Sequence, residues 1–116
     1  MRYLLLIQIN ASAAPLSRAE LEAILKGHER FEAELQAAGK GKMVHHERLR
    51  PAEEASRVCL KAGQTLVTDG PFIECNEVLG GFYVIECDTK DEAIDWAKRI
   101  PLRDDRSIEV RPIWPK

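Results

Sequence analysis

A four-residue turn near the middle of the chain constrains the fold more than any other feature. Asp69 can hydrogen-bond its own backbone, Gly70 is free to adopt a positive φ, and Pro71 has a fixed φ. Phe72 follows as a large apolar anchor. A run of alternating side chains that begins after Gly80 has the pattern of a β-strand. The sequence therefore predicts a shaped loop between two strands, with φ > 0 at Gly70.

Length and charge limit the class of protein. A chain of 116 residues forms one domain, which we take as residues 1–116. The net charge of -2 and the pI near 5.9 give no basic surface for phosphate backbones. The apolar run at residues 3–7 is too short for a membrane span or a signal-peptide core. We expect a soluble, cytoplasmic protein that binds neither nucleic acid nor membranes.

The cysteines do not indicate a disulfide framework or a zinc site. There are three of them, at positions 59, 75 and 87, and none forms a CxxC pair. Cys59 and Cys87 lie in strand-like runs, so we expect small core residues there. Cys75 falls in the loop. A reactive thiol at that position would need an activating neighbour, which the sequence does not identify.

Local patterns predict two helices and six strands. Ser17 and Glu20 form a capping box that opens a helix ending at Gly39. Thr89 and Glu92 form a second box, and the helix after it ends at the next proline. The expected strands are residues 1–9, 42–49, 57–60, 65–68, 81–87 and 107–114. The third and fourth of these strands form a hairpin.

This order of elements predicts an α+β, ferredoxin-like fold. Right-handed crossovers place both helices on one face of a mainly antiparallel sheet. The first strand nevertheless has apolar side chains on both sides, for example Leu5 on one and Leu4 and Leu6 on the other. The helix-free face therefore needs a cover, and a second copy of the chain is the simplest one. We expect a homodimer, a dimeric α+β barrel with a pocket between the facing sheets.

The chain resembles the DGPF-domain proteins of the YCII-related family. The likeness rests on the turn at residues 69–72 and extends from residues 3–7 through 92–94 to 108–112. It implies the same dimeric α+β barrel but no settled activity. Family members are often encoded beside, or fused to, extracytoplasmic-function sigma factors. The resemblance therefore also implies an accessory role in a transcriptional response as an alternative to catalysis.

Asp69 is the leading candidate for acid-base chemistry. It ends a predicted strand at a rigid turn, and Phe72 follows closely enough to restrict water. Desolvation of the carboxylate would raise the pKa of Asp69 toward that of a general acid or base. The alternative is that Asp69 only caps the turn. The family resemblance favours the functional interpretation, because this aspartate belongs to the naming motif.

A second candidate is the run His45-His46-Glu47, where members of the family more often have small residues before the glutamate. Alternate residues of a strand share a face, so His45 and Glu47 lie together and His46 does not. An imidazole oriented by a carboxylate is a common acid-base arrangement. Met43 and Leu49 fall on the same face and suggest that it looks inward. The alternative is a surface strand with an incidental histidine pair.

Five further side chains are candidates for binding an anionic substrate. Glu74 and Glu77 are three residues apart and would point the same way if the loop formed a helical turn. Arg57 and Arg111 lie in predicted strands, where a guanidinium can hold a carboxylate with two hydrogen bonds. Phe72 would line the pocket. The alternatives are solvated charges and, for Arg57, an edge-strand charge that discourages aggregation.

No cofactor and no metal are predicted, since GxGxxG, P-loop, nucleophile-elbow and HExxH motifs are absent. His28 lies on the apolar stripe of the first helix and is expected to be a hydrogen-bonded core histidine. Two functions remain. One is an enzyme of isomerase, lyase or hydrolase type that acts on a small anionic compound through Asp69, helped by His45 and Glu47. The other is a non-catalytic ligand-binding or regulatory module.

Overall fold

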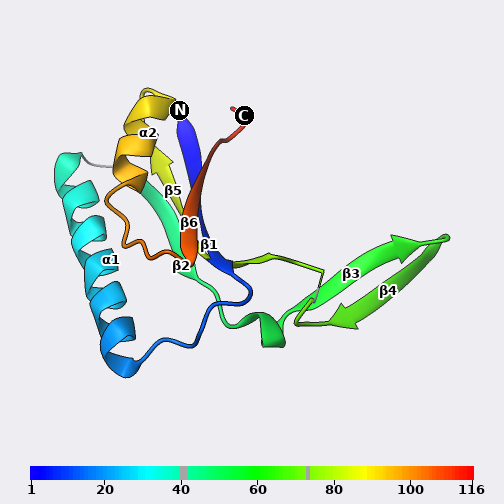
Figure 1. The fold of residues 1–116 in the computed structure, drawn as a ribbon. Helices are drawn as coiled ribbons and strands as arrows, with labels where there is room; N and C mark the ends of the chain where they lie inside the picture. Colours follow the sequence, from blue (N-terminus) through cyan, green and yellow to red (C-terminus); the bar gives the residue numbers. More distant parts are fainter. Residues whose placement is uncertain (40–41, 73) are drawn as a thin grey trace.

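The computed structural model describes residues 1–39, 42–72 and 74–116 (Figure 1). A four-stranded antiparallel sheet has the order β2-β5-β1-β6, and β3 and β4 form a separate hairpin. This order is ferredoxin-like, with the hairpin inserted between the second and third strands of the sheet. The elements are β1 (Arg2–Asn10), α1 (Arg18–Ala38), β2 (Met43–Arg48), the 3-10 helix η1 (Ala52–Glu54), β3 (Ser56–Lys61), β4 (Gln64–Asp69), β5 (Glu77–Glu86), α2 (Lys90–Ala97) and β6 (Arg106–Pro112).

Both helices begin where the sequence predicts. The Ser17 hydroxyl accepts from the Glu20 amide and the Glu20 carboxylate accepts from the Ser17 amide, so the first capping box is complete. The Thr89 hydroxyl accepts from the Glu92 amide, but the Glu92 carboxylate bonds the Asp88 amide instead of that of Thr89. The second box is therefore only half formed. Within the described residues, neither helix is long and apolar enough to span a membrane.

The core lies between the two helices and one face of the sheet, as predicted (Figure 1). Leu5, Leu35 and Ile85 are fully buried there, so β1, α1 and β5 each contribute a side chain that no water reaches. Each of these buried methyl-bearing side chains stabilises the fold by about 1.5–3 kcal/mol relative to exposure. Further buried side chains of the core are Tyr3, Ile7, Phe31, Tyr83, Cys87, Ala93, Trp96, Ala97 and Ile100.

The opposite face of the sheet has no helix over it, and we call it the open face. Leu4 lies beside Val84 and Leu6 beside Phe82 in the pairing of β1 with β5, and all four side chains are half-buried. The predicted apolar character of both sides of β1 is confirmed. In the single chain, however, only the helix-covered side is fully buried.

A β-bulge in β2 changes which residues reach the open face. Met43 pairs with Ile85 and His45 pairs with Val84, so two steps along β2 match one step along β5. Met43 packs against the core, whereas His45 shares the face of Val84. The prediction that Met43 and His45 share a face is therefore wrong, because the extra residue reverses the alternation.

A second irregularity explains why β5 is longer than predicted. The strand begins at Glu77 instead of residue 81. Ile7 of β1 pairs with Gly81 and the next residue pairs with Leu79, so Gly80 is the extra residue. A Cβ on Gly80 would lie 2.5 Å from the Ile9 side chain, which explains a glycine at this close approach. The pair of glycines thus interrupts the strand pattern without ending the strand.

The hairpin of β3 and β4 forms an arm that extends from the body. In Figure 1 the helices lie on one side of the sheet and the arm extends on the other. The predicted two-residue turn is confirmed, with φ of 51° at Ala62 and 79° at Gly63. Cys59 is exposed on the arm, so its predicted core position is wrong, whereas Cys87 is buried as predicted.

Candidate functional site

Asp69 is the last residue of β4 and lies at the base of the arm. Its carboxylate accepts a hydrogen bond of 3.0 Å from the hydroxyl of Ser56, the first residue of β3. Asp69 is exposed in the single chain, so the expected desolvation by Phe72 is not present. The geometry makes Asp69 a link between the two strands of the arm, and its carboxylate keeps lone pairs that water or a ligand can use.

Gly70 is required for a different reason from the one predicted. Among the described residues, positive φ occurs at Ala62 and Gly63 and not at Gly70. The Gly70 amide donates a hydrogen bond of 2.7 Å to the Ala55 carbonyl. A Cβ on Gly70 would clash with the Ala52 carbonyl oxygen. The prediction of φ > 0 is wrong; close approach of two backbone segments requires the glycine.

Arg57 contacts three residues of the loop between β4 and β5, and we call these four residues the arm-base cluster. Its guanidinium lies 3.8 Å from the ring centroid of Phe72, forms an ion pair with Glu74, and donates to the Cys75 sulfur over 3.4 Å. The Glu74 backbone amide and Arg57 hold the pKa of the Glu74 carboxyl below its usual value. Arg57 is therefore a contact partner of Cys75 that the sequence did not identify.

Glu77 does not join this cluster. Glu74 lies in a turn, whereas Glu77 is the first residue of β5 and pairs with Asn10. The two glutamates therefore do not share a helical turn, and that expectation is wrong. The loop leads directly into a strand because Glu77, Val78 and Leu79 continue the ladder with β1 beyond the bulge.

His45 and Glu47 lie together on the open face, as alternation along β2 requires. The His45 Nε2 atom is 3.5 Å from the Glu47 carboxylate, and both side chains are more than half exposed, at 59% and 58%. The ring of His45 lies 5.9 Å from that of Phe82, centroid to centroid. The pair therefore combines an orientable imidazole, a carboxylate and an apolar ring on one surface.

The other edge of the open face carries a second ion pair. Leu4 lies opposite Arg111 and Leu6 opposite Glu109 in the pairing of β1 with β6. The Arg111 guanidinium and the Glu109 carboxylate form a salt bridge. The apolar centre of the open face is thus bordered by His45 and Glu47 on β2 and by Glu109 and Arg111 on β6.

His46 faces the helices and belongs to a different group. Its Nδ1 atom is 3.0 Å from the Glu32 carboxylate, and its ring stacks on Tyr83 at 5.4 Å. The Tyr83 hydroxyl is 2.8 Å from the Nδ1 atom of His28, so the expected hydrogen bond of this histidine is confirmed, although His28 is half-buried at the edge of the core instead of inside it. Burial, followed by the charges of Arg106, Arg48 and His46, lowers the pKa of His28. Burial also raises the pKa of Tyr83.

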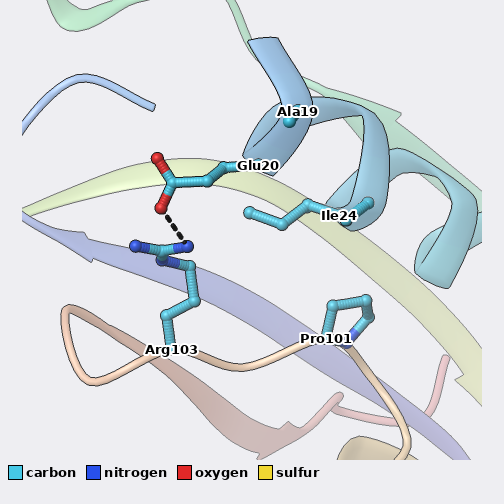
Figure 2. Close-up of a pocket in the computed structure, with 6 residues that line it drawn as sticks. Ala19, Glu20, Ile24, Pro101 and Arg103 are labelled. Atoms are coloured by element: carbon cyan, nitrogen blue, oxygen red, sulfur yellow. Dashed lines mark ion pairs between the residues drawn. The ribbon is translucent and has the colours of Figure 1, made fainter. Parts of the chain in front are cut away.

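A shallow groove of about 440 Å³ runs between α1 and the segment after α2 (Figure 2). Ala19, Ile24 and Pro101 provide apolar contacts, and the Glu20 carboxylate and Arg103 guanidinium meet at one end over 2.7 Å. Hydrogen bonds from Ser17 and then Arg103 lower the pKa of the Glu20 carboxyl. Because these charges neutralise each other, the groove has little attraction for an anionic compound.

The candidate residues fall into two neighbouring regions. At the arm base Arg57 contacts Phe72 and Glu74, whereas Asp69 bonds Ser56 on the other face of the hairpin. The open face carries the other candidates except Glu77. Within residues 1–39, 42–72 and 74–116, no three or more His, Cys, Asp or Glu side chains converge as metal ligands. Sequence reasoning missed the contacts of Arg57, because they join a strand to a loop that follows it by more than ten residues.

The fold and the open face define an α+β protein with a ferredoxin-like sheet that is covered by helices on one side. The chain belongs to the YCII-related domain family, which matches residues 1–116. It is also similar to an uncharacterized protein of Rhizobium meliloti (strain 1021), with 43% identity over 75 residues. That match covers 63% of this chain and 60% of the relative, so it spans less than two thirds of either protein.

Proposed function

We propose that this protein binds a small anionic organic compound in a chamber between the open faces of two copies. Leu4, Leu6, Phe82 and Val84 support this proposal, because they form a continuous apolar surface that is only half-buried in one chain. Ligand sites are usually apolar concavities with a few placed polar groups. Two facing sheets would enclose such a space, and the ion pairs at the edges of the open face would supply the polar groups.

The observation that carries the proposal is the contact of His45 with Glu47 beside Phe82. A carboxylate on one ring nitrogen fixes the imidazole and leaves the other nitrogen for proton transfer. Closure of the chamber by a second copy would remove water from this pair and strengthen its interaction with a ligand. We therefore assign acid-base chemistry of isomerase, lyase or hydrolase type to His45, with Glu47 as its orienting group.

Arg111 and the arm base would recognise the charge of the ligand. The Arg111 guanidinium lies on the open face, where a ligand carboxylate can compete with Glu109. The arm begins at the end of the sheet where β2 stops (Figure 1), so its base, with Asp69 and the arm-base cluster, would lie near the mouth of the proposed chamber. Asp69 is the second proton-transfer candidate in this arrangement.

A non-catalytic ligand-binding or regulatory module is the alternative, and one observation favours it. Asp69 is exposed and bonded to the Ser56 hydroxyl instead of to a second titratable group. A role beside an extracytoplasmic-function sigma factor would need ligand binding without turnover. A cytoplasmic location and association with such a sigma factor both stay predictions.

The neighbouring histidines provide a matched test. Wild type, His45→Gln and His46→Gln are titrated with a panel of small aliphatic and aromatic carboxylic acids while backbone amide signals are followed by NMR. We expect shifts in β1 and β5, a tenfold or greater loss of affinity for His45→Gln, and less than twofold for His46→Gln. Shifts that stay away from the open face would contradict the proposed chamber. Unchanged binding by His45→Gln, with no conversion of any bound acid, would favour the regulatory module.

A further inference from the structure

The arm has one apolar face that its own chain leaves uncovered. Val58 lies opposite Val67, and Leu60 follows on the same face. Their exposed fractions are 67%, 68% and 76%, although these are the side chains that a strand normally buries. A lone two-stranded hairpin is marginally stable in water. The arm therefore needs a surface to pack against.

The direction and length of the arm indicate where that surface lies. The arm extends on the side of the sheet that has no helices (Figure 1). Its strands have six residues each, so the arm is about 20 Å long at about 3.3 Å per residue. Facing sheets pack about 10 Å apart. An arm of this length would reach past the sheet of a facing copy and would contact the edge of that sheet and the layer behind it.

The contact area leads to the same partner. The sheet has four strands, and its edge strands have six and seven residues. At the usual rise per residue and the usual spacing between strands, the open face has an area of about 400 Å², or about 800 Å² for two copies. Stable interfaces bury about 1,200–2,000 Å². One face of each arm would bury about 200 Å² of its own surface and about 200 Å² of the other copy. Two arms would therefore raise the buried area of the whole interface from about 800 Å² to about 1,600 Å².

We propose that each arm clasps a second copy of the chain through Val58, Leu60 and Val67. This inference rests on the proposed face-to-face homodimer and adds a role for the arm in it. The arm starts at Ser56 and ends at Asp69, so docking of the arm also fixes Asp69 and Arg57 at the mouth of the chamber. Each ligand site is then complete only when the second copy holds the arm in place.

Photo-cross-linking tests the contact directly. A benzophenone amino acid replaces Leu60 on the apolar face or, as the control, Leu66 on the opposite face, where it lies beside Cys59. We expect irradiation to give a covalent dimer from position 60 at least fivefold more than from position 66. Mass spectrometry should place the cross-link on the body of the other copy. A cross-link to residues 56–69 of the other copy would show arm-to-arm pairing and overturn the inference.

A pair of charge substitutions gives an independent measurement. Val67→Asp places a carboxylate on the apolar face, and Leu66→Asp places it on the other face of the arm. We expect the dimer dissociation constant from light scattering to rise at least tenfold for Val67→Asp and less than threefold for Leu66→Asp. If wild type is a dimer, but position 60 gives no cross-link and Val67→Asp does not weaken the dimer, the proposed role of the arm is overturned. The homodimer itself would still stand. A wild-type monomer that binds carboxylic acids would overturn both the arm contact and the chamber between copies.

Discussion

The Ser56 hydroxyl donates a hydrogen bond of 3.0 Å to the Asp69 carboxylate and so joins the first residue of β3 to the last of β4. This contact gives the aspartate of the family motif a structural role in addition to any chemical one. The two roles can be separated, because an amide can replace the carboxylate as an acceptor and an alanine cannot.

Asp69→Asn should leave stability almost unchanged, because the side-chain carbonyl of the substituted amide can still accept from Ser56. Asp69→Ala and Ser56→Ala should each cost about 0.5–1.5 kcal/mol, the usual value of one hydrogen bond. If Asp69 transfers protons, Asp69→Asn and Asp69→Ala should both also lower turnover of a converted acid by about a hundredfold, because both remove the carboxylate. Urea unfolding of the three variants checks the structural part. A large loss of stability in Asp69→Asn would argue against the catalytic role.

Gly70→Ala should destabilise the fold, since its methyl group would clash with the Ala52 carbonyl oxygen. We expect a loss of about 1–3 kcal/mol, as for other overpacked sites. Gly63→Asn is the control: position 63 has a positive φ that Asn tolerates, and nothing lies within 4 Å of the added Cβ. Thermal melts of both variants decide the point, and equal melting temperatures would refute the close-approach explanation.

Neighbouring leucines of β1 should respond differently to a charge. Leu5 is fully buried in the core, so Leu5→Asp should unfold the protein by placing an unpaired carboxylate there. Leu4 is half-buried on the open face, so Leu4→Asp should retain the folded circular-dichroism spectrum and dissociate the dimer. A folded Leu4→Asp dimer with wild-type affinity would mean that the open face is not the interface.

The stability of the protein should fall as the pH decreases below neutrality, and His28 should account for part of the fall. Burial lowers the pKa of His28 in the folded protein, so the unfolded chain binds the proton more readily. This contribution to stability is complete when the pH is above 6.5, the ordinary pKa of histidine. It is lost as the pH falls through the lower pKa that His28 has in the folded protein. The nearby positive charges of Arg106 and Arg48 add to the effect.

His28→Gln removes this titration and keeps a side chain that can bond the Tyr83 hydroxyl. Free energies of unfolding measured between pH 8 and pH 5 should therefore depend less on pH in His28→Gln than in wild type. Gly63→Asn at the tip of the arm is the control, because it neither adds nor removes a titratable group and should leave the slope unchanged. An identical slope in wild type and His28→Gln would refute the assignment.

Most of the fold follows from local patterns in the sequence. The capping residues Ser17 and Thr89, the hairpin turn at Gly63 and the order of the elements all depend on neighbouring residues, and all were predicted. The start of β5 and the face of Met43 were not, because the bulges that set them arise from pairing with distant strands. Binary alternation assumes a regular ladder, and one extra residue reverses it.

The candidate site was less predictable for the same physical reason. Alternation correctly placed His45 and Glu47 on one face, since no irregularity separates them. The contact of Arg57 with Phe72 depends on how the arm base folds back on itself, which no local pattern encodes. The demand for glycine at position 70 likewise comes from the Ala52 carbonyl, which lies far along the chain.

The bulge in β2 also affects whether further copies of the chain can add to the edge of the sheet. β2 is an edge strand of the sheet, and an edge with regularly spaced amide and carbonyl groups is a template for the edge of another molecule. The extra residue between Met43 and His45 breaks that spacing on β2. Growth into filaments by strand addition is therefore disfavoured at this edge, whereas the proposed face-to-face association would close after two copies.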